Sequence, residues 1–317
     1  MKLNAAVIGC GSWGRNHARV YSELPNIDLV AVADTAPATV HEIAEKYRAK
    51  PYTDPDELLE DPEVQLVSIC TPTVTHADIA LAAIKRGKHV LVEKPMTDTV
   101  GEAEALIRAA RRQGVHLTVG FVERFNPAVQ EAYRMIAEGE IGDVILAHTR
   151  RVSQRPLRIG DVGVVKDLAI HDIDIASALF KDEPETVYST AGSIAHQFED
   201  YANINIGYAG NRTAFIEANW LTPKKVRQLN VTGTKGIMTV DYITQQLTIE
   251  NERQLTQPNI PYREPLYMEL RSFADSVIGD TPPSVTGEDG LKALRICEAA
   301  LKSSRTGKQV RLHQNPT

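Results

Sequence analysis

The chain has 317 residues, 43% of them hydrophobic and 24% charged, with a formal net charge of −6 at pH 7. This length exceeds one ordinary core and predicts two domains, and the negative charge argues against a nucleic-acid-binding or anionic-membrane-binding protein. No stretch approaches 18 uninterrupted apolar residues, so no membrane span is expected.

The first predicted elements are a strand, a glycine-rich turn, a helix and a second strand. An apolar run ends in G-x-G-x-x-G at Gly9, Gly11 and Gly14; a helix-like segment follows at 15–24, and the next apolar run ends in Asp34. Gly9 permits the tight turn, Gly11 lets a pyrophosphate approach the backbone, and Gly14 lets helix and strand pack closely. These are the parts of a dinucleotide-binding loop.

The context of the loop favours NAD over NADP. The helix N-terminus, with Ser12 and Trp13, offers N–H groups and a positive dipole end to the phosphates. Asp34 follows Gly14 by 20 residues, where a carboxylate accepts hydrogen bonds from the ribose hydroxyls. A 2′-phosphate would be repelled by Asp34, and residues 35–37 supply no arginine for it. A turn that merely packs a βα unit would leave Asp34 unexplained.

Alternating strands and helices continue to residue 120 and predict a parallel, doubly wound Rossmann sheet over residues 1–120. The strands are expected at 51–52, 64–70, 89–92 and 116–120. The helices are expected at 37–47, 54–60 and 79–86, and from a capping box at Thr99 to Gly114. Ligands bind outside the carboxyl ends of such strands, so Gly9, Asp34, Thr71 and Lys94 are expected to face one crevice.

Glu93-Lys94-Pro95 ends the predicted strand at 89–92. A lone lysine at a strand end is usually solvated surface. The alternative is a lysine beside the nicotinamide ribose and the reacting hydroxyl, where its charge stabilises a developing alkoxide. The pattern alone leaves both interpretations open.

Residues 121–317 predict an α+β domain with a large, mostly antiparallel sheet. Strands are expected at 144–152, 186–194, 202–208, 213–220, 227–232, 236–241, 246–250 and 310–312, and helices at 127–138, 266–278 and 289–304. Apolar and polar residues alternate along 202–208, as in a half-buried strand, and hairpin turns are expected at 210–211 and 234–236. A sheet face bare of helices predicts a homo-oligomer, either a dimer or a tetramer.

One helical segment of this domain carries Asp167 and His171, four residues apart and therefore on one face. A neighbouring carboxylate can hold an imidazole in one tautomer, and the imidazole can then act as a general base near neutral pH. The other interpretation is an exposed i,i+4 pair, which is the commoner case for an isolated pair.

Four arginines crowd the segment just before Asp167: Arg150, Arg151, Arg155 and Arg158. Among nearby acids Asp161 offsets them in part. Arginine matches phosphate geometry with paired donors, so a diphosphate site is one interpretation of this charge, and a solvated face or subunit contact is the other. Lys224 and Lys225 are candidates for the same patch.

Together these motifs resemble the glucose–fructose oxidoreductase/inositol dehydrogenase (Gfo/Idh/MocA) family, over essentially the whole chain including 288–304. The resemblance implies an NAD-dependent dehydrogenase in which His171 takes the proton of a sugar hydroxyl, Lys94 stabilises its oxygen, and Asp167 lies near the substrate. It implies a cofactor-binding set of Gly9, Gly11, Ser12, Trp13, Gly14, Asp34, Thr71, Pro72, His76, Glu93 and Lys94, although His76 has no constellation of its own in the sequence.

Residues 120–127 and 161–167 further resemble family members that oxidise the 3-hydroxyl of UDP-N-acetylhexosamines. This implies a nucleotide-sugar substrate such as UDP-N-acetylglucosamine, bound by Arg124, Asn126, Arg151, Arg155, Arg158, Asp167 and His171. The alternatives are a dehydrogenase of a free cyclitol or aldose, an NAD-dependent glycosidase of the same family, and a non-catalytic NAD-binding sensor. The complete set of Lys94, Asp167 and His171 argues against a sensor.

Cysteine usage and the N-terminus bear on localisation. Cys10, Cys70 and Cys297 are widely separated and form no C-x-x-C pair, which is typical of a reducing compartment and predicts no structural metal site. Cys10 and Cys70 are expected to be small buried residues rather than nucleophiles. The N-terminus leads directly into the first strand, so no signal peptide is expected. We therefore expect a cytoplasmic protein.

Overall fold

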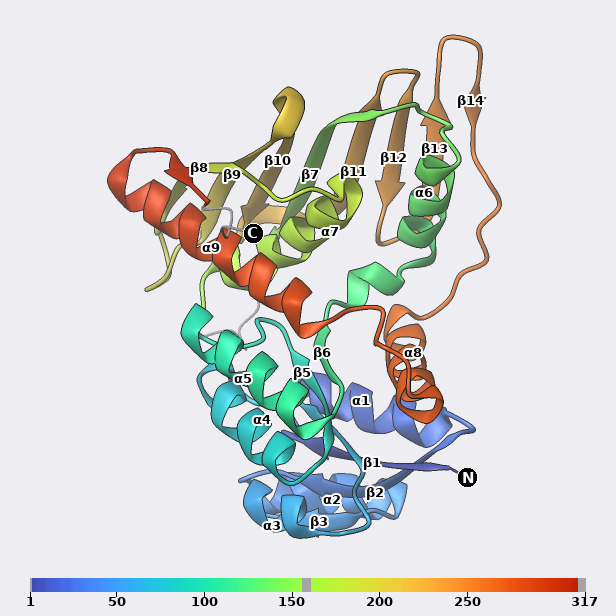
Figure 1. Cartoon of the computed structure of the whole chain (residues 1–317), viewed down its shortest axis with the longest axis vertical. Helices are drawn as coiled ribbons and strands as arrows, with labels where there is room; N and C mark the ends of the chain where they lie inside the picture. Colours follow the sequence, from blue (N-terminus) through green and yellow to red (C-terminus); the bar gives the residue numbers. More distant parts are fainter. Residues whose placement is uncertain (1, 156–160, 313–317) are drawn as a thin grey trace. The chain divides into compact units, whose positions relative to one another are not determined.

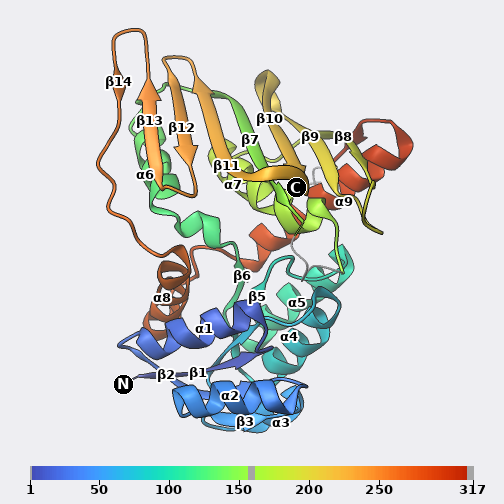
Figure 2. The same cartoon turned by 180° about the vertical axis from the view of Figure 1, so that it is seen from behind.

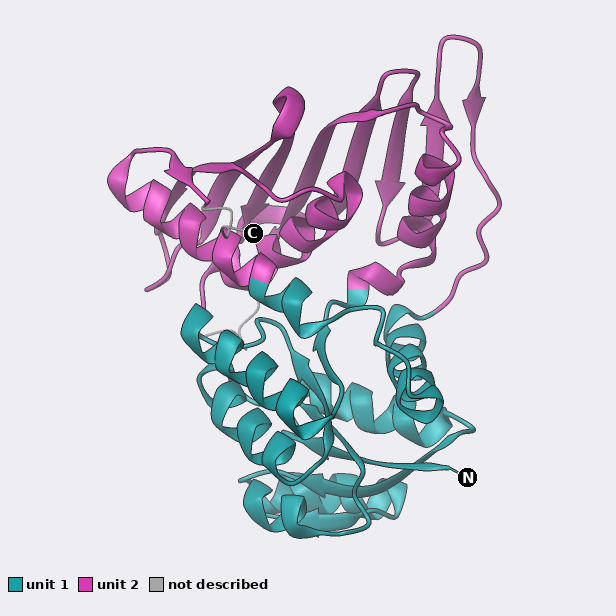
Figure 3. Ribbon diagram, in the orientation of Figure 1, with its two compact units in different colours: residues 1–122, 264–291 teal, residues 123–263, 292–317 magenta. Residues whose placement is uncertain are grey.

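The computed structural model describes residues 2–155 and 161–312, and the chain divides into two compact units (Figure 3). Unit 1 comprises Met1–Val122 and Glu264–Leu291, and unit 2 comprises Glu123–Arg263 and Lys292–Thr317. The predicted second domain contained every residue after 120. The contact-based units therefore differ from that division mainly in Glu264–Leu291, which returns to unit 1.

Unit 1 contains a parallel six-stranded sheet in the order β3-β2-β1-β4-β5-β6. The strands are β1 (Leu3–Ile8), β2 (Ile27–Ala33), β3 (Lys50–Tyr52), β4 (Leu66–Ile69), β5 (His89–Glu93) and β6 (Leu117–Gly120). This order reverses direction between β1 and β4, the point where doubly wound sheets bind ligands. The predicted Rossmann architecture is confirmed.

The helices of unit 1 begin and end at local signals. They are α1 (Ser12–Glu23), α2 (Pro37–Tyr47), α3 (Pro55–Glu60), α4 (His76–Lys85), α5 (Val100–Gln113) and α8 (Pro265–Gly279), with the short 3₁₀ turns η1 (Thr73–Thr75) and η2 (Val122–Phe125). The predicted capping box is present, because the Thr99 side chain accepts from the Glu102 amide and the Glu102 carboxylate accepts from the Thr99 amide. Gly114 ends α5 at φ +68°, the left-handed conformation that glycine favours.

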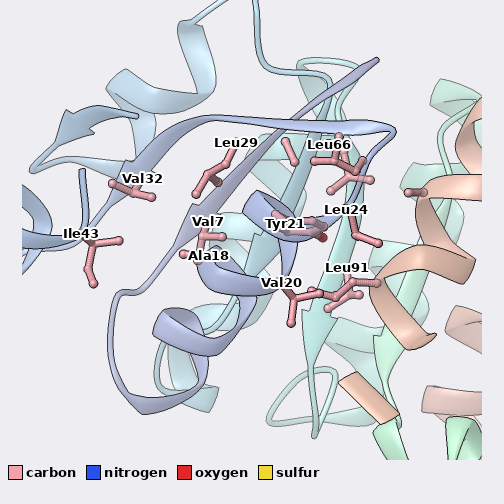
Figure 4. Close-up of a cluster of buried hydrophobic side chains, with 14 of the residues drawn as sticks. Val7, Ala18, Val20, Tyr21, Leu24, Leu29, Val32, Ile43, Leu66 and Leu91 are labelled. Carbon is pink, nitrogen blue, oxygen red and sulfur yellow. The ribbon is translucent and has the colours of Figure 1, made fainter. Parts of the chain in front are cut away.

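An apolar cluster explains why α8 belongs to unit 1. Figure 4 shows side chains of β1, α1, β2, α2, β4 and β5 packed together. Leu266, Leu270 and Phe273 of α8 are spaced as one helical face and are buried in the same cluster. In the turn between α1 and β2, Asn26 donates a 2.9 Å hydrogen bond to Asp275 of α8. The predicted domain boundary did not include α8 in the first domain, because the contact joins residues about 250 positions apart.

Unit 2 contains a nine-stranded sheet in the order β14-β13-β12-β11-β7-β10-β9-β8-β15. The strands are β7 (Val144–Gln154), β8 (Thr186–Gly192), β9 (Tyr201–Tyr208), β10 (Arg212–Asn219), β11 (Leu221–Gly233), β12 (Ile237–Asp241), β13 (Gln246–Glu250), β14 (Leu255–Thr256) and β15 (Val310–Arg311). The central pair β7 and β10 is parallel and the other pairs are antiparallel. A large, mostly antiparallel sheet is therefore confirmed.

The helices of unit 2 lie on one face of this sheet (Figures 1 and 2). They are α6 (Pro127–Ala137), α7 (Ile170–Phe180), preceded by the π-helical turn η3 (Val165–Ala169), and α9 (Gly287–Thr306), whose first turn belongs to unit 1; the 3₁₀ turn η4 (Ala209–Asn211) joins β9 to β10. No helix of the described chain is long and apolar enough to cross a membrane.

Strand β11 starts six residues before the predicted strand and contains a bulge. Its pairing with β7 moves from Leu221 opposite Gln154 to Val226 opposite Val152, so five positions of β11 advance against two of β7. The bulged segment, 222–225, includes Pro223. Proline has no N–H to donate to a ladder and is tolerated where the pairing is interrupted. Bulges also re-aim side chains, often beside functional sites.

Candidate active site

The glycine loop follows β1, and its three glycines differ in the space that a side chain would find. Gly9 has φ +91°, and a Cβ there would lie 2.8 Å from the backbone of Cys70. A Cβ on Gly14 would lie 1.7 Å from the carbonyl oxygen of Gly9. At Gly11 no described atom lies within 4 Å of the Cβ position. The loop thus requires glycine twice for packing, and at Gly11 it leaves the backbone open to a ligand.

The first turn of α1 has no competing acid. Gly11 is its N-cap, with no side-chain hydrogen bond to the cap and no acidic residue in the first turn. Ser12 is exposed there, and Trp13 is partly buried against the apolar cluster and contacts the His17 ring edge-on at 6.4 Å. An uncapped helix N-terminus with a positive dipole end suits a phosphate group.

Asp34 follows β2 and is fixed by backbone amides. Its carboxylate accepts hydrogen bonds from the amides of Cys10, at 2.7 Å, and Ala36, at 2.9 Å. Burial, with the nearby Asp34 charge adding to it, raises the pKa of the Cys10 thiol to about 12. The thiol therefore stays protonated at neutral pH, as expected for a packing residue, and Asp34 presents a fixed carboxylate next to the glycine loop.

Replacing Asp34 by alanine is expected to raise the Kd for NAD about tenfold or more, because hydrogen bonds to charged groups contribute about 1.5–3 kcal/mol. The preference for NAD over NADP is expected to narrow at the same time, since the repulsion of a 2′-phosphate is removed. Calorimetric titration with both cofactors measures the two effects. An unchanged Kd for NAD would show that Asp34 serves the loop alone.

Glu93 at the end of β5 is held by a buried histidine of α1. The Nε2 atom of His17 lies 3.1 Å from Oε1 of Glu93, and the two residues are 0% and 8% exposed. The other carboxylate oxygen accepts a 3.3 Å hydrogen bond from the Lys94 amide. A Cβ on Gly120 would lie 2.9 Å from the same carboxylate. Glu93 is thus enclosed by His17 and Gly120. Its contacts fix the backbone at the end of β5, where Lys94 follows.

His76, the first residue of α4, contacts the backbone of Pro95, which follows Lys94 after the end of β5. Its Nδ1 lies 2.9 Å from the carbonyl oxygen of Pro95, and its Nε2 lies 2.8 Å from that of Thr71. The residue is 1% exposed. Both ring nitrogens thus face backbone carbonyl oxygens, and a neutral imidazole can donate a hydrogen bond to one of them. His76 therefore joins the strand ends that carry Thr71-Pro72 and Lys94-Pro95.

Replacing His76 by glutamine is expected to lower kcat about 10-fold to 100-fold with little change in the Kd for NAD, because small misplacements of a catalytic group are costly. In a Lys94→Ala background the same change is expected to add little, which marks a residue acting through Lys94. His41→Gln, at an exposed position of α2, is the control. Equal losses in both backgrounds would exclude this positioning role.

In unit 2, Asp167 and His171 lie on neighbouring turns at the start of α7. Asp167 is in the π-helical turn η3 and His171 is the second residue of α7. The prediction of one regular helix needs this correction, since a π turn closes i→i+5 hydrogen bonds and such turns are frequent at functional sites. Asp167 is 6% exposed and His171 is 9% exposed, so the pair is not the exposed surface pair that the alternative required.

Arg151 is a structural residue, which corrects its predicted role in substrate binding. It is 1% exposed, and its guanidinium makes bonds of 2.7 Å and 3.1 Å to Asp172 and one of 2.8 Å to Glu123. The Tyr242 ring lies 4.9 Å from its Cζ atom. Buried carboxylates and an aromatic ring thus enclose the charge, and the donors that a diphosphate would need are already in use.

Two other predicted substrate ligands, Arg124 in η2 and Asn126 at the N-cap of α6, already have partners within the protein. Arg124 forms a bidentate pair with the buried Asp174, with both bonds at 2.6 Å. Asn126 is 1% exposed; its side chain caps α6 by accepting from the Ala128 amide and donates to the Tyr242 carbonyl. The structure therefore assigns Asn126 to helix capping, which corrects its predicted substrate contact.

The arginines before Asp167 do not form one patch. Arg150 points to the sheet face opposite Arg151 and pairs at 3.0 Å with Glu217, because successive residues of a strand alternate between faces. Arg155 donates a 3.3 Å bond to the Ala195 carbonyl. Arg158, the fourth, lies outside the described residues. Neither Glu123 nor His17 was assigned a functional role from the sequence. His17 follows Gly14 by three residues in α1, and this spacing indicates that the two share a helix face.

The fold of unit 1, with its glycine loop and Asp34, defines an NAD-binding Rossmann domain. Residues 3–121 match the family model described as "Oxidoreductase family, NAD-binding Rossmann fold", and residues 129–239 match the "GFO/IDH/MocA C-terminal domain". The chain belongs to the Gfo/Idh/MocA oxidoreductase family, and NAD is its cofactor.

Relatives in this family act on cyclitols and on a nucleotide sugar. The chain is 31% identical to scyllo-inositol 2-dehydrogenase (NAD(+)) of Bacillus subtilis, with 98% of this chain and 96% of the relative covered. It is 28% identical to UDP-N-acetylglucosamine 3-dehydrogenase of Acidithiobacillus ferrooxidans, with 95% and 96% covered. A solved structure of the latter enzyme superposes with a TM-score of 0.89 at 27% identity, covering 96% of this chain and 99% of that one.

Proposed function

We propose that this dehydrogenase oxidises a secondary ring hydroxyl of a nucleotide sugar, the 3-hydroxyl of UDP-N-acetylglucosamine or a close analogue, with NAD as hydride acceptor. The observation that carries the chemistry is the set of strand ends in unit 1, where the open glycine loop, the fixed Asp34 carboxylate and Lys94, next to the enclosed Glu93, follow strands β1, β2 and β5 of one parallel sheet. The nucleotide-sugar substrate is supported by the likeness to the UDP-N-acetylglucosamine 3-dehydrogenase.

The proposed reaction gives each residue one role. Asp34 and the amides after Gly11 bind the adenosine half of NAD, and Thr71 and Pro72 line its nicotinamide side. His171 removes the hydroxyl proton, and the Lys94 ammonium stabilises the oxygen as negative charge develops on it. The carbinol carbon transfers its hydride to NAD, and the products are the keto sugar, NADH and a proton. Asp167 orients the substrate or His171.

A free cyclitol is the second candidate substrate, favoured by the likeness to scyllo-inositol 2-dehydrogenase. The two candidates differ in charge, since a cyclitol is neutral and a nucleotide sugar carries a diphosphate. The corrected roles of Arg151 and Asn126 remove part of the predicted support for a diphosphate, so that support has to come from other cations of unit 2. An NAD-dependent glycosidase differs from both by releasing a free sugar without net NADH.

A substrate panel tests the proposal. The protein is incubated with NAD and with UDP-N-acetylglucosamine, UDP-glucose, myo-inositol, scyllo-inositol or glucose, and NADH absorbance is followed while mass spectrometry monitors the sugar. We expect UDP-N-acetylglucosamine to give the highest kcat/KM and a product lighter by two hydrogens. Turnover of the inositols alone would contradict the nucleotide-sugar substrate and keep the dehydrogenase.

The open face of the nine-stranded sheet supports a homo-oligomer. Tyr188 and Phe215 are 46% and 38% exposed, and the Arg150–Glu217 pair nearby neutralises itself. Weakly charged surfaces with exposed aromatic residues favour association. We expect light scattering to give a dimer or tetramer that Phe215→Lys dissociates, and a monomeric wild-type protein would refute the proposal.

A further inference from the structure

A pair of cations on β11 lies beside the Arg151 network. Arg227 stands directly opposite Arg151 in the pairing of β11 with β7. Lys225 is the last residue of the bulged segment 222–225, and its charge interacts with those of Arg227, Glu123 and Arg151. Asp167 also interacts electrostatically with Arg227. Arg227 therefore lies within electrostatic reach of the candidate catalytic carboxylate Asp167, and Lys225 lies within electrostatic reach of Arg227.

These cations have few anionic partners of their own. The recorded contact of Arg227 is 3.3 Å, from Nη1 to Oε1 of Glu123, and the same oxygen already accepts the 2.8 Å bond from Arg151. A guanidinium has five N–H donors, so within the described residues Arg227 keeps most of its donors. Lys225 is exposed, and its side chain makes no ion pair or hydrogen bond among residues 2–155 and 161–312.

The pKa values of Lys225 and Arg227 also indicate a cationic site. Partial burial lowers the pKa of Arg227, and the neighbouring charge of Arg151 lowers it further. The charge of Arg227 in turn lowers the pKa of Lys225, with partial burial adding to the effect. Lys225 is thus repelled by Arg227 and Arg151, and Arg227 is repelled by Arg151. An added anion would relieve this repulsion, and the Arg227 side chain, 33% exposed, is accessible to one.

We propose that Lys225 and Arg227 form a subsite for the anionic group of the substrate, the phosphoryl oxygens of a sugar phosphate or nucleotide sugar. A planar guanidinium matches two phosphoryl oxygens, and a lysine ammonium adds a flexible point charge. The inference rests on the proposed function and deepens it, since a subsite of this kind, beside Asp167, selects substrates with a phosphate near the oxidised ring. These two cations take the place of the substrate contact that was predicted for Arg151.

Binding without turnover is the first test. UDP, uridine and inorganic pyrophosphate are titrated calorimetrically into the NAD-loaded protein and into Lys225→Ala, Arg227→Gln and the control Lys302→Ala, an exposed lysine of α9. We expect UDP to bind the wild-type protein far more tightly than uridine does. Each subsite variant should weaken UDP about tenfold, the effect of one charged hydrogen bond, and the control should not.

Turnover distinguishes the sources of the anion. The kcat/KM of each variant is measured for UDP-N-acetylglucosamine, N-acetylglucosamine 1-phosphate, glucuronate and myo-inositol. We expect Lys225→Ala to raise KM about tenfold for the phosphorylated sugars and to leave kcat/KM for myo-inositol unchanged. An effect on glucuronate alone would assign the subsite to a carboxylate and overturn the phosphoryl assignment.

Failure of the subsite and failure of the proposed function are separable. UDP binding that is equal in wild-type, Lys225→Ala and Arg227→Gln would overturn the subsite, whatever the enzyme oxidises. Tight, Lys225-dependent binding of UDP without any oxidation would keep the subsite and refute the dehydrogenase. Should Arg227→Gln fail to fold, the exposed Lys225→Ala variant decides the question alone.

Discussion

Replacing Lys94 or His171 by alanine is expected to lower kcat about 10²-fold to 10⁴-fold, the usual contribution of a positioned acid, base or charge. The Kd for NAD is expected to stay within a few-fold, because the glycine loop and Asp34 remain intact. Stopped-flow measurement of NADH formation gives the first quantity, and calorimetric titration gives the second.

Matched controls come from exposed positions of unit 1. Lys85→Ala at the end of α4 and His41→Ala on α2 remove the same groups from exposed sites and are expected to retain wild-type turnover. The double variant of Lys94 and His171 is expected to lose less than the product of the single losses, since residues acting on one step are non-additive. Full activity in both single variants would refute the assigned chemistry.

Replacing Arg151 by methionine is expected to lower the free energy of unfolding by about 3–5 kcal/mol, the cost of removing one partner from a buried ion pair. Asp172, 0% exposed, and Glu123, 6% exposed, would lose the charge that accompanies their burial. Urea denaturation followed by circular dichroism measures the change.

The neighbouring arginine provides the control. Arg150 pairs with Glu217 on the exposed face, where its side chain is 45% accessible, so Arg150→Met is expected to cost no more than about 1 kcal/mol. The double variant Arg151→Met, Asp172→Leu is expected to recover part of the loss, because it removes an unpaired buried charge. Equal stability of the two single methionine variants would contradict the structural role of Arg151.

The elements of unit 1 could be predicted from the sequence because their signals are local. The glycine loop, the capping box at Thr99 and the Gly114 cap each lie within a few residues of the element they begin or end. The position of α8 could not be predicted in this way. Its apolar face could pack against the core of either unit. The hydrogen bond from Asn26 to Asp275, which joins it to unit 1, spans most of the chain.

The candidate site was predictable where topology decides it. Asp34, Thr71 and Lys94 follow the ends of parallel strands, and the alternation of strands and helices is sufficient to bring such ends to one edge. His17 was given no functional role because its partner is a carboxylate 76 residues away. His76 was included only in the cofactor-binding set that the resemblance implies, because its own partners are two backbone carbonyls. Backbone acceptors leave no trace in a sequence.

The prediction that the arginines before Asp167 form one phosphate site was wrong, although the sequence contained the evidence against it. Arg150 and Arg151 are consecutive in a predicted strand, and consecutive strand residues point to opposite faces. The two could therefore never bind one ligand together. The prediction rested on local charge density and ignored this alternation. It also ignored Glu123 and Asp172, which lie 28 and 21 positions from Arg151 in the sequence.

Transfer of hydrogen from the sugar ring to NAD is the central claim. The most direct test incubates the protein with NAD and UDP-N-acetylglucosamine carrying deuterium at the ring carbon of the 3-hydroxyl, then extracts the cofactor for mass spectrometry, which also detects cofactor that stays bound. We expect reduced cofactor that carries the deuterium, together with a keto sugar that has lost it. Unlabelled cofactor beside an unchanged nucleotide sugar would contradict it.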